Sequence, residues 1–153
     1  MELLPALNIS ASGLTAERLR LDLIAGNLAN INTTRTPRGG PYRRQVPVFA
    51  ERLQEALGQT SGQSLNAAPG QVPGGFAGRG VEVAAIYEDD TPPRMVYDPA
   101  HPDADANGYV ALPNINIVTE MIDMITASRA YEANVTTLNA AKAMTMKALE
   151  IGR

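Results

Sequence analysis

The sequence predicts an α+β chain in which two long terminal helices form an antiparallel coiled-coil hairpin around a small β-rich centre. Three observations predict this fold. Leucines recur every seven residues near the N-terminus, a helical apolar pattern fills the C-terminal part, and glycine and proline concentrate between them. The expected parts are residues 1–33, an N-terminal coiled-coil helix; 34–113, a central β-rich or loop region; and 114–153, a C-terminal coiled-coil helix.

The N-terminal helix is expected over Pro5–Ile31. Its leucines at seven-residue spacing are Leu7, Leu14, Leu21 and Leu28. That spacing is typical of a coiled-coil seam, although Ser10 and Glu17 interrupt the second register. Pro5 suits the first helical turn, where its missing N–H is not needed.

The central region has little helical periodicity, and only Phe49–Leu57 shows some. Gly58–Gly80 is rich in Gly, Gln, Ser and Pro, which predicts a flexible surface loop. Asn107-Gly108 is a turn signal directly before the last of the expected strands. Three segments have strand-like composition: Val81–Tyr87, Met95–Tyr97 and Tyr109–Leu112.

The C-terminal helix is expected from Ile117 to Ile151, a length of about 50 Å. Its stripe consists of Ile117, Met121, Met124, Ser128, Tyr131, Val135, Leu138 and Leu149. Asn114 or Asn116 is the expected N-cap, and Gly152 stands where the helix would stop.

Both helices also carry apolar residues outside these stripes. Examples are Leu19, Leu23, Ile122, Ile125, Met144 and Met146. A helix that is apolar on several faces must be surrounded by other elements. The Gly-rich centre is too small to surround both helices, so oligomerisation is one interpretation. The pattern alone leaves a monomeric helical hairpin equally open.

Composition narrows the function classes. The net charge of −3 is unlike the basic balance of a nucleic-acid-binding protein. The absence of cysteine excludes disulfides, thiolate metal sites and a cysteine nucleophile. No apolar run reaches the length of a membrane span, and the N-terminal residues lack the features of a cleaved Sec signal.

Two features resemble catalytic or metal sites. Asp103–Gly108 matches the first half of an EF-hand loop, but Asn114 stands where the loop needs a bidentate glutamate. An Asx-rich turn leading into a strand is the better interpretation. His101 is the one histidine, and the sequence has no G-x-S-x-G motif that would supply a nucleophilic serine for a Ser-His-Asp arrangement. A hydrolase using His101 or the Asp103–Asp105 turn is the enzymatic alternative. We expect no enzyme, no cofactor and no metal.

Charge separates along the central region into a basic segment that includes Arg43 and Arg44 and an acidic one from Glu82 to Asp105. Solvated loops are the simple interpretation. The sharper hypothesis is electrostatic complementarity between neighbouring subunits. It predicts that reversing Arg43 and Arg44 to Glu blocks assembly without changing the fold of the monomer.

Two segments resemble the terminal signatures of flagellar rod and hook axial proteins. They are Gly26–Thr33 (GNLANINT), at the end of the first helix, and Ser128–Asn134 (SRAYEAN), within the second. Pro41–Arg44, and Asp103–Val110 (DADANGYV) followed by Pro113-Asn114, are similar to the proximal rod family FlgC in particular. The resemblance covers both termini and the end of the centre, whereas Gln54–Gly78 looks longer than is usual for that family.

The resemblance implies a structural subunit of the bacterial flagellar basal body, in the periplasmic rod that transmits torque to the hook. Such proteins are exported unfolded by the flagellar type III apparatus without signal cleavage. Their terminal helices are largely disordered in the monomer and pack as coiled coils in the rod, with the centre facing outward. The implied partners are FlgB, FlgF, FlgG, the adaptor FliE and further copies of the chain.

Residue roles follow from the resemblance. The four seam leucines should pair with Met121, Met124, Tyr131, Val135 and Leu138, and Asn27 should bond exposed backbone or bridge helices. For Asn30 and Asn32, simple helix termination is the favoured role. Two alternatives stay open: another rod or hook protein, FlgB- or FlgG-like, and a soluble helical hairpin that binds a partner helix.

Overall fold

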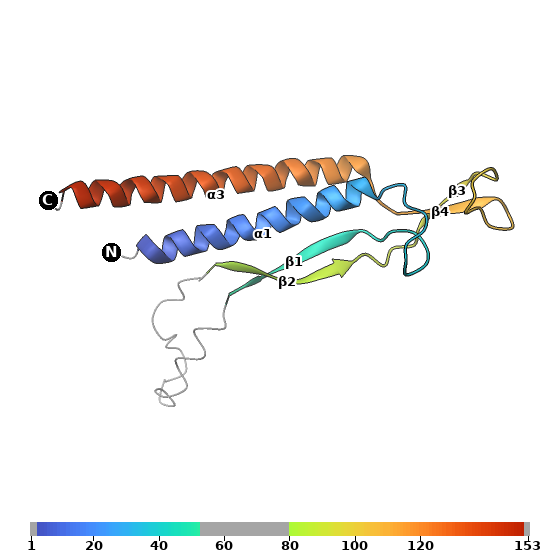
Figure 1. Ribbon diagram of the computed structural model, residues 1–153, viewed down its shortest axis with the longest axis horizontal. Helices are drawn as coiled ribbons and strands as arrows, with labels where there is room; N and C mark the ends of the chain where they lie inside the picture. The colour runs from blue at the N-terminus through green and yellow to red at the C-terminus, as the bar shows by residue number, and fades with distance from the viewer. Residues whose placement is uncertain (1–2, 53–79, 152–153) are drawn as a thin grey trace, which may run out of the picture.

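The molecule is an elongated stack of three layers, seen edge-on in Figure 1. The computed structural model describes residues 3–52 and 80–151. Helix α1 (Leu3–Ala29) lies in the middle, with helix α3 (Ile117–Ile151) on one side and the hairpin of β1 (Gln45–Glu51) and β2 (Val81–Glu88) on the other. A second hairpin, β3 (Arg94–Tyr97) and β4 (Tyr109–Leu112), projects past the ends of the helices. The α+β prediction is confirmed.

Local side chains satisfy free backbone groups at the start of α3 and at the end of α1. Asn116 accepts the amide of Val118 at 2.9 Å, which makes it the N-cap of α3 and confirms one of the two expected positions. At the end of α1, the Asn30 side chain donates to the carbonyl of Gly26 at 2.9 Å, which confirms its terminating role. The predicted limits of α3 match those observed, and α1 ends two residues earlier than expected.

The two helices run antiparallel in close contact, and small side chains make this possible. A Cβ added to Gly13 would lie 3.0 Å from the amide nitrogen of Asn134, so a side chain there would require Asn134 to shift. The most buried apolar residues of the pair are Ala16, Ile24, Ala127 and Ala141. The interface therefore depends on close backbone approach more than on large side chains.

One row of α3 faces α1 along its length. Glu120, Ala127 and Ala141 are buried, and Asn134 covers Gly13. These four positions are spaced by seven residues. The contacts from α1 keep the same step, because Gly13 and Asn27 are fourteen residues apart, as are their partners Asn134 and Glu120.

The β1–β2 hairpin is antiparallel, with a register shift between Val48 and Phe49. β2 confirms a predicted strand, whereas β1 was not predicted. The helical periodicity of Phe49–Leu57 does not apply to Phe49 to Glu51, which belong to β1, and residues 53–57 lie outside the described part of the chain. Pro47 fits here because β1 is an edge strand, where a missing backbone donor is tolerated.

Ser12 of α1 holds the start of β2, directly after Gly80. The Ser12 hydroxyl accepts the Val81 amide at 3.0 Å and donates to the Ile9 carbonyl at 2.7 Å. Gly80 has a φ of +108°, and a Cβ there would lie 2.2 Å from the Ser12 oxygen. Only glycine fits this contact. The rest of the Gly58–Gly80 segment, which we expected to be a loop, lies outside the described residues.

The β3–β4 hairpin confirms two further predicted strands and the Asn107-Gly108 turn. At the loop end of its two strands, Tyr97 and Tyr109 form an edge-to-face pair whose ring centroids are 5.3 Å apart. Gly108 has a φ of +81°, and a Cβ there would approach the ring of Tyr97 to 2.9 Å. The Thr34 hydroxyl, which donates to the Asp103 carboxylate at 2.8 Å, links this hairpin to the segment after α1.

Candidate functional site

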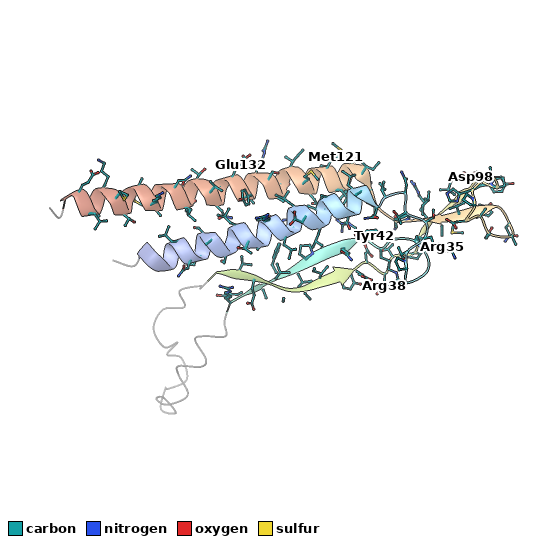
Figure 2. The ribbon with its side chains drawn as sticks, viewed as in Figure 1. Arg35, Arg38, Tyr42, Asp98, Met121 and Glu132 are labelled. Atoms are coloured by element: carbon teal, nitrogen blue, oxygen red, sulfur yellow. The ribbon has the colours of Figure 1, made fainter. Side chains whose placement is uncertain are left out.

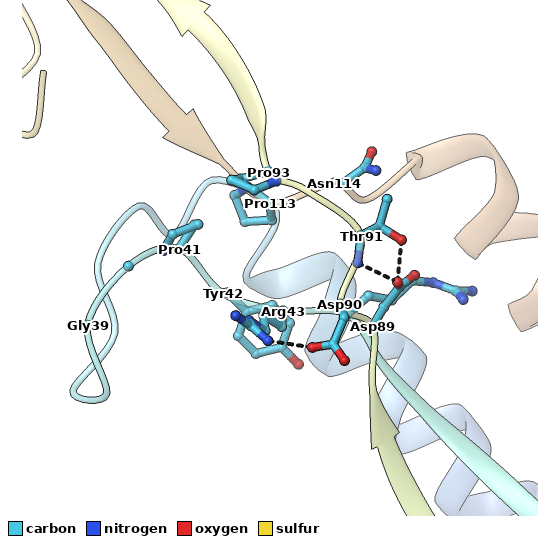
Figure 3. A pocket seen from close by; sticks show the side chains of 12 residues that line it. Gly39, Pro41, Tyr42, Arg43, Asp89, Asp90, Thr91, Pro93, Pro113 and Asn114 are labelled. Carbon is cyan, nitrogen blue, oxygen red and sulfur yellow. Dashed lines mark hydrogen bonds and ion pairs between the residues drawn. The ribbon is translucent and has the colours of Figure 1, made fainter. Parts of the chain in front are cut away.

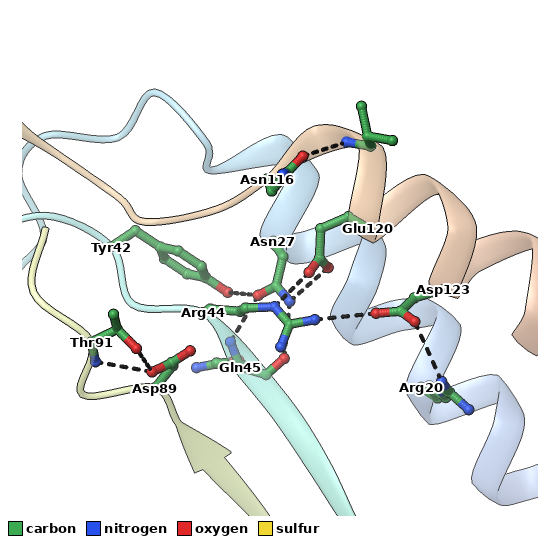
Figure 4. A network of polar contacts seen from close by, with 11 residues as sticks. Arg20, Asn27, Tyr42, Arg44, Gln45, Asp89, Thr91, Asn116, Glu120 and Asp123 are labelled. Atoms are coloured by element: carbon green, nitrogen blue, oxygen red, sulfur yellow. Dashed lines mark hydrogen bonds and ion pairs between the residues drawn. The ribbon is translucent and has the colours of Figure 1, made fainter. Parts of the chain in front are cut away.

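The three layers meet at one buried amide, that of Asn27 near the end of α1 (Figure 4). Its oxygen accepts the Gln45 amide at 2.9 Å and the Tyr42 hydroxyl at 3.1 Å. Its nitrogen donates to the Gln45 carbonyl at 2.9 Å and to the Glu120 carboxylate at 3.1 Å. An asparagine side chain has two donors and two acceptor positions, so its whole capacity is used.

Glu120 of α3 lies at the centre of a charged group beside this amide. The Glu120 residue is 1% exposed. One carboxylate oxygen accepts from Asn27, and the other accepts a hydrogen bond from Nε of Arg44 at 2.5 Å. The same guanidinium donates to Asp123 at 3.2 Å, and Asp123 lies 3.8 Å from Arg20 of α1. A buried carboxylate is tolerated only when it is paired and hydrogen-bonded, and here Arg44 supplies the opposite charge and Asn27 a further hydrogen bond.

We call Asn27, Tyr42, Arg44, Gln45 and Glu120 the polar node. Its hydrogen bonds connect α1, α3 and the segment that leads into β1. The prediction that Asn27 bonds backbone or bridges helices is confirmed, since it does both. The node therefore fixes the hairpin and both helices relative to one another at this end of the molecule.

Tyr42 is the node residue whose ionisation is displaced. Burial, then the negative charges of Glu88 and Glu120, raise the pKa of Tyr42 above its usual value. The folded state thus holds this proton more tightly than the unfolded state does. The resulting stability is complete below about pH 10 and is lost as pH rises through the folded pKa.

Replacing Tyr42 with phenylalanine should lower the free energy of unfolding at pH 7 by about 1 kcal/mol, because the bond to Asn27 is lost. It should also reduce the fall in stability above about pH 10, because the variant has no hydroxyl to ionise. Denaturant unfolding of both proteins at several pH values measures this. Parallel curves above pH 10 would contradict the assignment.

A shallow pocket of about 160 Å³ adjoins the node (Figure 3). The loop from Gly39 to Arg44 forms one wall, and Asp89, Thr91 and Pro113 are among the residues opposite. The hydroxyl and the amide of Thr91 both donate to Asp89, which lowers the pKa of that carboxyl. These bonds stabilise the turn after β2, and that stability is lost as pH falls through the folded pKa.

The predicted seam residues mostly lie where the helices can shield them. Those that are half-buried are Leu7, Leu14, Leu21, Leu28, Met124, Tyr131, Val135 and Leu138. The prediction that Met121 belongs to this seam is wrong, since Met121 is 52% exposed (Figure 2). The preceding residue, Glu120, faces α1, and one step along a helix turns the next side chain by about 100°.

Arg43 and Arg44 have different environments despite being neighbours. Arg43 pairs with Asp90 at 2.6 Å, and both side chains are more than half exposed. Arg44 is 25% exposed and bonds the buried Glu120. Reversing both arginines therefore cannot leave the monomer fold unchanged as expected, because Glu at position 44 would face Glu120.

The turn from Asp103 to Gly108 is held by bonds between the Asp105 side chain and the backbone of the turn. Asp105 accepts the amides of Asn107 and Tyr109, both at 2.8 Å, which confirms the expected Asx turn. His101 accepts a hydrogen bond from the Asp103 amide at 3.1 Å.

Within residues 3–52 and 80–151, no cluster of three potential metal-binding side chains occurs. Over the same residues, neither helix has the length and apolar character needed to cross a bilayer.

Comparison with known proteins decides the family. The model of the flagella basal body rod protein family matches residues 7–35, and that of the flagellar basal body rod FlgEFG protein C-terminal region matches residues 106–151. The flagellar basal-body rod protein FlgC of Borreliella burgdorferi is 49% identical, with 99% of this chain and 98% of that protein covered. The FlgC proteins of Bacillus subtilis and Salmonella typhimurium are 46% and 40% identical, with 97% and 100% of both chains covered.

The chain belongs to the FlgC family of flagellar basal-body rod proteins. The resemblance seen in the sequence is thereby confirmed, as is the role of a structural rod subunit that assembles with other rod proteins. FlgC is a structural family, so the chain is not an enzyme and the hydrolase alternative is removed.

Sequence reasoning missed most of the polar node in this FlgC-family chain. Glu120, Tyr42 and Gln45 were not singled out, and Arg44 was assigned to contacts between subunits. One signal could have found Glu120: it begins the series that continues at Ala127, Asn134 and Ala141 every seven residues. Small and polar residues at heptad spacing are a signal of a close helix interface, just as large apolar residues at that spacing are.

Proposed function

We propose that the chain is a proximal-rod subunit that assembles through its terminal helices. Residues 1–33 and 114–153 pair as a coiled-coil hairpin and pack against the helices of neighbouring subunits. Residues 34–113 face outward. The heptad spacing of the buried row on α3 supports the coiled-coil pairing.

The observation that carries this proposal is the uncovered side of α3. α1 is the one described element that packs along α3, so the opposite side is open. That side carries an apolar stripe with exposed fractions between 49% and 64%. The stripe consists of Ile117, Val118, Met121, Ile122 and Ile125.

These five positions form one continuous face, because each lies three, four, seven or eight steps from others of the set, and residues at those steps lie together on a helix. Monomeric proteins rarely leave such a contiguous apolar surface in water. A neighbouring subunit's helix would cover it at the stagger typical of helix packing. We call this set the outer stripe of α3.

The subunits that would cover it are copies of the chain and the rod proteins FlgB, FlgF and FlgG, together with the adaptor FliE. In this proposal the flagellar type III apparatus exports the chain without removing a signal. The assembled rod crosses the periplasm and transmits torque. Paired helices suit that role, because force along the rod is carried by continuous packed backbone.

Replacing Leu21 with aspartate should abolish incorporation into the rod. The change puts a charge on a half-buried position of α1 and removes about 1.5–3 kcal/mol of apolar burial. A flagellated strain without its own FlgC, supplied with the variant, should be non-motile, and its purified basal bodies should lack the chain. Wild-type chain must restore both readouts. A motile strain carrying the variant alone would contradict the proposal.

A further inference from the structure

The carboxylate of Glu120 belongs to α3, yet its partners come from two other layers. One oxygen accepts from Asn27 of α1 and the other from Arg44, directly before β1. We infer that Asn27, Arg44 and Glu120 are positioning residues that couple docking of the β1–β2 hairpin to docking of α3. The three layers then close and open as one unit at this end of the molecule.

Each layer supplies a partner that the others lack. If α3 left, the buried Asn27 would lose the acceptor for one N–H, and Arg44 would lose both of its carboxylates. If the hairpin left, Glu120 would lie against α1 without a compensating charge. Either partial state loses the charged and neutral hydrogen bonds that the departing layer supplied to the node, so both are less stable than the closed state.

The coupling extends into β2 through the backbone. The Arg44 carbonyl accepts the Asp89 amide at 2.8 Å, so the position of Arg44 also fixes the end of β2. The opposite end of the hairpin is different, because Val81 is held by Ser12 of α1 without any contribution from α3. The hairpin therefore has one end coupled to α3 and one end attached to α1 alone.

The coupling lies within one chain, so it holds whether or not the chain assembles as proposed. Its consequence for the rod would be geometric. The β1–β2 hairpin can take its final position only on a chain whose helices have paired. The node would thus give every subunit the same angle between its helical and β-rich parts.

Hydrogen exchange of single backbone amides in the full-length chain, followed by NMR, tests this inference. Glu120→Gln changes α3, whereas the amides to watch are Gln45 and Asp89, which bond Asn27 and Arg44. We expect both amides to exchange about tenfold faster in the variant, because a charged hydrogen bond is removed from the node. The matched control is Glu132→Gln, an exposed position on the same helix, which should leave both rates unchanged.

A second measurement needs no variant. In wild-type protein at low urea concentrations, the Gln45 amide and the amides of the second turn of α3 should share one opening free energy and one urea dependence. Effects of Glu120→Gln that stay within α3 would overturn the coupling. So would separate openings in the wild type, or a Gln45 amide that is not protected in the isolated chain.

Discussion

Replacing Arg44 with methionine should lower the free energy of unfolding at pH 7 by about 3 kcal/mol. Methionine keeps most of the side-chain volume but leaves Glu120, 1% exposed, without its compensating charge. Removing one partner of a buried ion pair typically costs about 3–5 kcal/mol. Arg44 is 25% exposed, and this partial access to water places the expected loss at the lower end.

Arg43 provides the matched control, because it is the adjacent residue and also forms a short ion pair. Its pair with Asp90 is more than half exposed on both sides. Exposed pairs contribute about 0–1 kcal/mol, so Arg43→Met should change stability by no more than that. Urea unfolding followed by circular dichroism measures both variants. Equal losses for Arg43→Met and Arg44→Met would show that the node is not a buried electrostatic centre.

The double variant Arg44→Met/Glu120→Met separates the charge from the position. It removes both charges and fills the site with apolar side chains of similar volume. Buried ion pairs replaced in this way are often neutral or stabilising. We therefore expect the double variant to regain most of the stability lost by Arg44→Met, with a coupling energy above about 1 kcal/mol. Additive losses would contradict this account.

Elements with a local signal were predictable from the sequence. α3 has apolar residues at helical spacing from Ile117 to Leu138, and its N-cap candidate Asn116 is a polar residue just ahead of it. Strand composition and Asn107-Gly108 predicted the last hairpin. β1 was missed because Pro47 interrupts its alternation.

The polar node was not predictable because its contacts are distant in sequence. Asn27 is 93 residues from Glu120, and Arg44 is 76 residues from it. The seven-residue series that begins at Glu120 indicates a helix interface but not the partners of this carboxylate, and glutamates are rarely fully buried. Only the path of the chain through the central region brings Arg44 to it. The resemblance of Gly26–Thr33 to a family signature marked Asn27, without saying what it contacts.

Replacing Ile122 with aspartate should abolish motility while leaving the isolated chain as stable as the wild type. Ile122 belongs to the outer stripe of α3 and is 58% exposed. An exposed substitution of this kind changes stability by about 0.5 kcal/mol or less. In the assembled rod the same position would be covered, and a buried charge without a partner would oppose every contact made there.

Three measurements distinguish the possibilities. Thermal unfolding of the purified chain reports the fold, swimming in soft agar reports function, and the chain content of isolated basal bodies reports assembly. Asn107→Asp is the matched control, since it adds the same charge at an exposed loop position in the β3–β4 hairpin. We expect that control to swim.

Leu21→Asp and Ile122→Asp then probe different surfaces of the same helix pair. Leu21 is shielded within the chain, so its replacement should weaken both the fold and assembly, whereas Ile122 should affect assembly alone. Normal swimming with Ile122→Asp would mean that the outer stripe of α3 stays in water in the rod. The neighbouring subunit would then have to contact another surface, and the packing proposed for α3 would be wrong.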